Sequence, residues 1–176
     1  MPSFSGVHGT TSSHAYNIQR VGFIIGSVDE YKRMFGNGVY MYKNDENGKL
    51  YAREWAKSKI IKECIEGEYE CILIVDFYFD DNEHITWSDE EELGFLEWMN
   101  RERKSISPNG KLTREIQNEC RMLFVNAAAE RMIRPYTVIF ANMPFPKHLS
   151  NHGKKRYGAC VVKNCSILPS PPYIQE

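Results

Sequence analysis

The chain of 176 residues is predicted to fold as one α+β domain over residues 1–176, with a mostly antiparallel sheet and flanking helices. Short runs rich in β-branched and aromatic residues, bounded by Gly or Pro, indicate several strands. Stretches with apolar residues at three-and-four spacing indicate helices between some of them. No internal repeat or linker divides the sequence. A domain of this length buries about two-thirds of the surface that its unfolded chain exposes, so it needs no disulfide or metal ion for stability.

Each element is predicted from its local pattern. The expected order is a strand over 4–8, a helix over 14–21, a strand over 39–42, helix 50–65, strand 69–79, helix 88–103, helix 112–132, strand 136–141 and strand 157–168. Ser88-Asp89-Glu90-Glu91 has the pattern of a capping box at a helix start. Residues 45–48 are predicted as a surface turn, 101–111 and 147–156 as loops, and the Pro-rich tail as a surface segment.

Composition narrows the class of protein. Lys plus Arg number 22 and Asp plus Glu 23, which gives a net charge of −1. This balance argues against a protein whose main surface is a nucleic-acid-binding groove. The five cysteines form no C-x-x-C pair, which is typical of free thiols in a reducing compartment. The start of the chain lacks the pattern of a secretion signal, and no apolar run approaches the ~18 residues of a membrane span. A cytoplasmic protein without a membrane segment is therefore expected.

Three short segments in the first fifty residues carry the chemistry. They are Val7-His8-Gly9-Thr10, Arg20-Val21-Gly22-Phe23 and Phe35-Gly36-Asn37-Gly38-Val39-Tyr40, followed closely by Tyr51 on a predicted helix. A glycine beside a histidine at a strand end lets a flat ligand approach main-chain N–H and C=O groups. Each segment alone has a simpler explanation as a turn, a surface histidine or core packing. Their joint order and spacing favour a ligand site.

These segments resemble the poly(ADP-ribose) polymerase and diphtheria-toxin branch of the ADP-ribosyltransferase superfamily. Members of that branch carry His-Gly-Thr/Ser, then Gly-Phe/Leu, then Phe-Gly-x-Gly-x-Tyr, and a second tyrosine eleven residues after the first, as Tyr51 follows Tyr40. The resemblance covers residues 4–60 and implies an ADP-ribosyltransferase-like split sheet. It also implies an enzyme that cleaves NAD, its co-substrate, to nicotinamide and transfers ADP-ribose to an acceptor.

The resemblance assigns a role to each matching residue. His8 would hydrogen-bond a ribose hydroxyl of NAD, and the Gly9 backbone would hold the carboxamide of nicotinamide. Tyr40 and Tyr51 would sandwich the nicotinamide ring, so the catalytic set would be His8, Tyr40 and Tyr51. Thr10 and Gly38 would complete the NAD site. The protein would contribute mainly positioning and electrostatics.

The sequence departs from the family at the glutamate expected on a late strand. Gly158 or Ala159 stands at that position. Glu119 or Glu130 could supply a carboxylate from the preceding helix, and Asn142 could supply another polar contact. Members without this glutamate are mono-transferases or inactive, so mono-ADP-ribosylation is expected rather than polymer synthesis. The alternatives are a catalytically silent module that binds NAD or ADP-ribose, and an RNA 2′-phosphotransferase.

The acceptor and the partners stay open at this point. A protein or nucleic-acid acceptor fits the resemblance, and basic residues at 101–104 and 147–156 could contact diphosphate or nucleic acid. Similarity to small bacterial members suggests a toxin, which would have an antitoxin or immunity protein as partner. His148 and His152 precede Cys160 and Cys165, but this interval fits a zinc site poorly, so no metal is expected.

Overall fold

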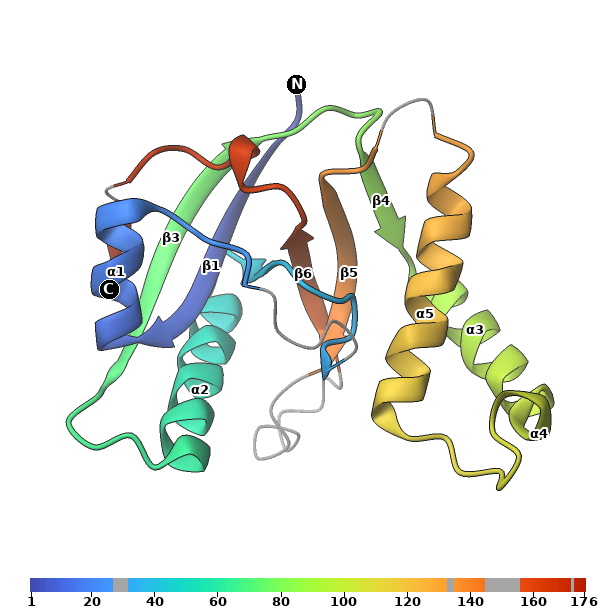
Figure 1. Ribbon diagram of the computed structural model, residues 1–176. Helices are drawn as coiled ribbons and strands as arrows, with labels where there is room; N and C mark the ends of the chain where they lie inside the picture. The colour runs from blue at the N-terminus through green and yellow to red at the C-terminus, as the bar shows by residue number, and fades with distance from the viewer. Residues whose placement is uncertain (27–31, 133–134, 145–155, 172) are drawn as a thin grey trace.

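The computed structural model describes residues 1–26, 32–132, 135–144, 156–171 and 173–176. The described strands form one sheet in the order β4-β5-β6-β2-β1-β3-β7 (Figure 1). They are β1 (Ser3–Thr11), β2 (Val39–Lys43), β3 (Glu70–Tyr78), β4 (His84–Trp87), β5 (Val138–Pro144), β6 (Arg156–Val162) and β7 (Ile174–Gln175). All described pairings are antiparallel except β4 with β5. The predicted α+β class with a mostly antiparallel sheet is confirmed.

The helices are α1 (Ser12–Val21), α2 (Glu46–Glu63), α3 (Asp89–Arg101), α4 (Arg103–Ile106) and α5 (Arg114–Ala129). The three longest begin at residues whose side chains accept hydrogen bonds from otherwise unpaired N–H groups. Asp45 accepts from Gly48 before α2, and Thr113 accepts from Ile116 before α5. Ser88 and Glu91 form the capping box that the sequence predicts before α3.

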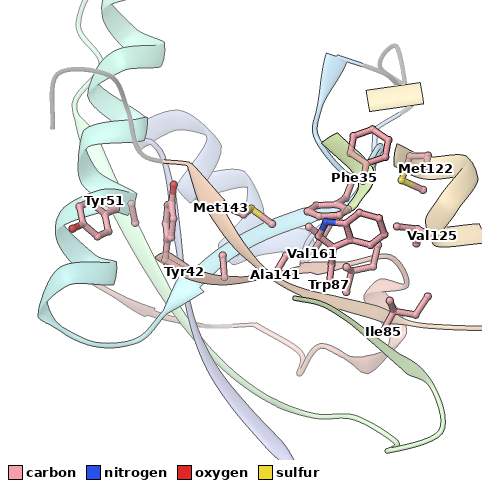
Figure 2. Close-up of a cluster of buried hydrophobic side chains, with 14 of the residues drawn as sticks. Phe35, Tyr42, Tyr51, Ile85, Trp87, Met122, Val125, Ala141, Met143 and Val161 are labelled. Atoms are coloured by element: carbon pink, nitrogen blue, oxygen red, sulfur yellow. The ribbon is translucent and has the colours of Figure 1, made fainter. Parts of the chain in front are cut away.

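The two faces of the sheet carry separate cores. One core joins the sheet to α2, α3 and α5 through side chains such as Tyr51, Phe95 and Val125. Figure 2 shows Tyr51 and Val125 among the side chains of this core. The other lies under α1 and includes Ala15 and Tyr173. Burying both faces is what stabilises the central strands, because apolar surface removed from water is the main favourable term in folding.

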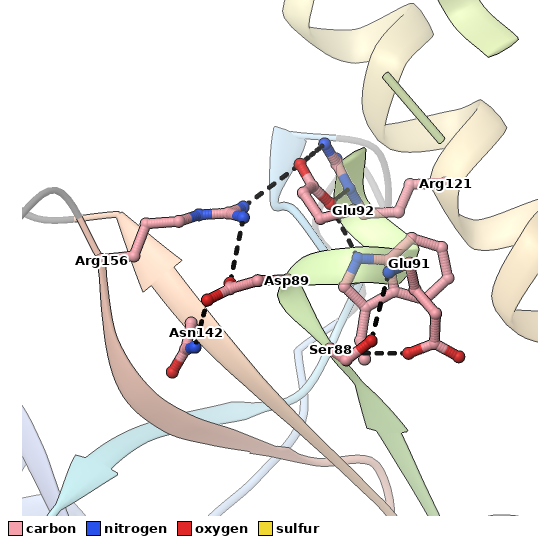
Figure 3. A network of polar contacts seen from close by, with 8 residues as sticks. Ser88, Asp89, Glu91, Glu92, Arg121, Asn142 and Arg156 are labelled. Atoms are coloured by element: carbon pink, nitrogen blue, oxygen red, sulfur yellow. Dashed lines mark hydrogen bonds and ion pairs between the residues drawn. The ribbon is translucent and has the colours of Figure 1, made fainter. Parts of the chain in front are cut away.

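An ion-pair network with a buried centre attaches α3 and α5 to the first residue of β6 (Figure 3). The Glu92 carboxylate accepts hydrogen bonds from the Arg121 Nε and Nη2 atoms at 2.9 Å each, and from the Trp87 indole at 2.7 Å. Arg156 forms a further ion pair with Glu92 at 3.1 Å and one with Asp89 at 3.7 Å. Burial alone would raise the pKa of Glu92, but Arg121, Trp87 and Arg156 together outweigh it and the pKa lies below its usual value.

Several predicted boundaries differ from those in the structure. Helix α2 begins at Glu46 rather than residue 50, so residues 45–48 are its first turn and not a surface turn. The chain packs so tightly there that a Cβ on Gly48 would lie 1.8 Å from the Lys43 carbonyl oxygen. Strand β4 was not predicted, and part of the loop predicted at 101–111 forms α4.

The end of the chain also differs from the prediction. The tail does not simply lie over the surface, because β7 pairs with β3 and Tyr173 is buried. The last predicted strand, 157–168, ends as β6 at Val162 and is followed by a 3₁₀ turn over Cys165–Ile167. Within the described residues, no helix has the length and apolar character needed to span a membrane.

Candidate functional site

The sheet opens between β1 and β2. Pairing between these strands includes Gly6 with Lys43 and Val7 with Tyr42, and it stops there. Beyond that point β1 remains paired with β3 as far as Thr11, while β2 remains paired with β6 back to Val39. The two strands therefore diverge at residues 8–11 and 39–41.

A cavity of about 710 Å³ occupies this opening. Its lining comes mainly from β1, β2, α1, α2 and the segments around residues 22–26 and 32–34, and α5, β5 and β6 contribute one residue each. Five of the six predicted site residues line it, namely His8, Gly9, Thr10, Gly38 and Tyr40. Segments that are far apart in the sequence thus meet at one hollow.

His8 bridges the gap where the ladder ends. Its Nδ1 atom lies 2.9 Å from the Tyr40 carbonyl oxygen, and its ring meets the Phe23 ring edge-on at a centroid distance of 5.2 Å. Desolvation lowers the pKa of His8 to about 4, against the opposing effect of the bond to Tyr40, so the imidazole is neutral at pH 7. A carbonyl only accepts, so Nδ1 carries the hydrogen. The Nε2 lone pair is then available as an acceptor.

Gly9 directs its main-chain polar groups toward the opening. In an antiparallel ladder, alternate residues bond to opposite neighbours. Ile72 exchanges both backbone hydrogen bonds with Glu176, so its β1 partner Gly9 points its N–H and C=O away from β3. The residue must also be glycine for packing, because a Cβ would lie 1.9 Å from the Ala52 carbonyl oxygen of α2.

Tyr40 is fixed by its hydroxyl. This group donates to the Gly36 carbonyl at 2.8 Å and accepts from the Phe35 N–H at 3.0 Å, which closes the turn before β2. Desolvation raises the pKa of Tyr40 to about 12, so the phenol keeps its proton at neutral pH. The Arg33 guanidinium lies 5.7 Å from the centre of the Tyr40 ring.

Tyr51 does not lie with the other predicted site residues. It is 2% exposed, lies outside the lining of the cavity, and packs between the rings of Tyr42 and Tyr157 at 5.8 and 5.2 Å. The aromatic residues that line the cavity with Tyr40 are Phe23, which belongs to the predicted motifs, together with Tyr42 and Trp55. The sequence contains signals for both, since Tyr42 shares a strand face with Tyr40 and Trp55 lies one helical turn after Tyr51.

The cavity has a basic lining. Five cationic residues contribute to it, namely Lys32, Arg33, Lys59, Lys62 and Arg114, against one acidic residue, Glu63. Such an excess suits a ligand that carries phosphate groups. Of the basic positions noted in the sequence, residues 147 and 154–155 lie outside the described part of the chain.

The candidates for a replacement carboxylate are not at the cavity. Glu119 and Glu130 are exposed and absent from its lining, so α5 does not supply the carboxylate considered for it. Ala159 lines both the cavity and a smaller neighbouring hollow, and Gly158 lines only the smaller one. The Asn142 amide donates to Asp89 at 3.0 Å and also lies at that smaller hollow.

Comparison with protein-family models, curated proteins and solved structures finds no match for this chain. Among the described residues, no group of three or more His, Cys, Asp or Glu side chains is placed to hold a metal ion. His148 and His152 lie outside the described residues. All five cysteines are free, with Cys160 buried and Cys165 half-buried.

Proposed function

We propose that this protein is an NAD-dependent mono-ADP-ribosyltransferase. The observation that carries the proposal is the opening between β1 and β2, where the His8 ring and the Gly9 main chain face one cavity. A carboxamide has an NH₂ donor and a C=O acceptor, which complement the C=O and N–H of Gly9. The neutral His8 offers Nε2 to a ribose hydroxyl, and the cationic lining suits the diphosphate of NAD.

The reaction breaks the bond between the nicotinamide nitrogen and the ribose C1 atom. The bonding electrons go to the ring nitrogen, which leaves as neutral nicotinamide, and the ribose becomes oxocarbenium-like until an acceptor nucleophile attacks C1. Residues of this site position the two rings and the ribose rather than react covalently. The acceptor is a protein or a nucleic acid, and single transfer is expected because the resemblance puts Gly158 or Ala159, neither of which is acidic, where polymerase-like members carry glutamate.

A second candidate function is a module that binds NAD or ADP-ribose without cleaving it. The lining at Ala159 favours it, because an oxocarbenium-like state gains stability from a nearby negative charge. An RNA 2′-phosphotransferase is a third candidate, with Arg33 and Arg114 as the arginines at the cavity. A role as a toxin with an antitoxin partner would follow only from transfer activity in cells.

Nicotinamide release from NAD, with and without cell extract, separates these candidates. We expect release that rises with extract and falls about two- to twelvefold in Tyr40→Ala, since an aromatic contact contributes about 0.5–1.5 kcal/mol. Tyr78→Ala is the matched control, because that tyrosine is exposed on β3 and outside the cavity lining.

The other outcomes assign the other functions. Release that does not depend on extract would indicate an NAD hydrolase, and calorimetric binding without release would indicate the silent module. Loss of phosphate from 2′-phosphorylated RNA in the presence of NAD would identify the phosphotransferase. Failure of the wild-type protein to bind NAD at all would contradict the proposal.

A further inference from the structure

We infer that Trp55, held by Tyr42, presents the second aromatic face to the nicotinamide ring, in place of Tyr51. The inference rests on the proposed function, because it names the contacts of the same NAD site. Sequence spacing alone selects Tyr51, eleven residues after Tyr40. The positions of the side chains select the residue one helical turn further along α2.

The Tyr51 side chain is buried in the core. Its ring meets Tyr42 at 5.8 Å with a tilted geometry and Tyr157 edge-on at 5.2 Å. Such pairs contribute about 0.5–1.5 kcal/mol each beyond their buried area. Moving Tyr51 into the cavity would break both contacts and open a void in the core.

Trp55 is accessible on the cavity side of the same helix. It is 38% exposed and belongs to the lining. The Ala52 carbonyl packs against Gly9, as the 1.9 Å clash of a Cβ there shows. Trp55 follows Ala52 by three residues, which places both on one side of α2. The indole therefore lies one turn from the main-chain groups proposed to hold the carboxamide.

Tyr42 fixes the orientation of the indole. The Trp55 Nε1–H donates a hydrogen bond to the Tyr42 hydroxyl. Desolvation raises the pKa of Tyr42, so its hydroxyl remains protonated and can accept this bond at neutral pH. A ring whose rotation is already fixed loses little conformational entropy when a ligand stacks on it.

The chemistry of an indole at this place predicts selectivity for oxidised NAD. The nicotinamide of NAD is a pyridinium cation, and tryptophan is the aromatic side chain that attracts cations best. The reduced dinucleotide carries a neutral, non-aromatic ring, and so does not gain this attraction. Because the cation is present in the bound substrate and absent from released nicotinamide, Trp55 acts mainly on substrate binding.

Calorimetry with NAD and its reduced form, together with tryptophan emission, tests the inference. We expect Trp55→Ala to weaken NAD binding about three- to thirtyfold, the range of a partly desolvated cation–π contact, and to reduce the preference over the reduced form. The change should appear in KM rather than kcat. Tyr51→Phe should leave NAD affinity unchanged, and Tyr42→Phe, which keeps the ring but loses the acceptor, should have an intermediate effect.

The emission signal assigns the contact to one of the three tryptophans. NAD should quench the wild-type protein and the control Trp98→Phe alike, since Trp98 lies on α3 against Phe95 and Phe124. Trp55→Phe should lose the quenching and still bind NAD. If wild-type protein binds NAD but Trp55→Ala binds equally well, the inference fails and the proposed function stands. If wild-type protein does not bind NAD, both fail.

Discussion

His8 is held in its neutral form by its surroundings, and this has a consequence for stability. Its pKa is about 4 in the folded protein and 6.5 in the unfolded chain. Below pH 6.5 the unfolded chain therefore binds a proton that the folded protein does not. Proton binding then favours unfolding, so the His8 contribution to stability declines as the pH falls from 6.5 to about 4.

Urea unfolding between pH 8 and 4 checks this prediction. The wild-type free energy of unfolding should decline through the window from pH 6.5 to 4, and His8→Gln should flatten that part of the profile. Carboxylates with lowered pKa values, such as Asp45 and Glu92, lose their contribution to stability only at lower pH. They therefore add little to the change in stability over most of this pH window. Equal slopes for the two proteins would contradict a buried neutral His8.

Gly9 offers a prediction about close packing. In Gly9→Ala the new methyl group would meet the Ala52 carbonyl, and α2 would have to move away from β1. We expect a loss of at least about 1–3 kcal/mol of stability, the usual cost of overpacking, together with weaker NAD binding. Gly94→Ala is the control, because Gly94 lies at an exposed position of α3 and a Cβ there meets nothing within 4 Å. That change should stabilise the protein by about 0.5–1 kcal/mol in the same urea experiment.

At the scale of elements, the sequence predicts what depends on neighbouring residues. Helix α3 follows from its capping box and α2 from its apolar spacing, because both signals are local. Strand β4 could not be predicted, since its four residues gain strand geometry only from the parallel pairing with distant β5. The role of the tail was missed for the same reason, as β7 exists only through its pairing with β3.

The tail gives a prediction for an element. The Tyr173 ring packs against Phe23 at a centroid distance of 5.1 Å, and its hydroxyl donates to the Pro169 carbonyl at 2.8 Å. The backbone N–H and C=O of Tyr173 both bond to the side-chain amide of Gln19. Tyr173→Ala should cost about 3–5 kcal/mol, as for other large buried aromatics. Tyr173→Phe, which loses only the hydroxyl bond, should cost about 1 kcal/mol. Thermal or urea unfolding that ranks the two variants equally would contradict this account of the tail.

At the scale of the molecule, the sequence predicts which residues gather at the site better than what each one does there. The order of the motifs predicts His8, Gly9, Thr10, Gly38 and Tyr40, which the fold brings to one cavity. It also predicts Tyr51, which lies outside the lining, because the choice between two aromatic residues on one helix depends on how α2 is rotated against the sheet. It also cannot find Arg114, whose place at the cavity comes from the packing of α5.

Variants of the ion pair between Glu92 and Arg121 test how α3 and α5 are attached to the sheet. Both side chains are 5% exposed, so Arg121→Met should leave a buried carboxylate with Arg156 as its remaining cation and cost about 3–5 kcal/mol. The double variant Glu92→Leu, Arg121→Met removes both charges and should be less destabilised than the sum of the single variants. Additive losses in urea unfolding would contradict the pairing. NAD binding should persist in every variant that remains folded, because neither Glu92 nor Arg121 lines the cavity. The contacts that attach α3 and α5 to the sheet can therefore be weakened without changing the site between β1 and β2.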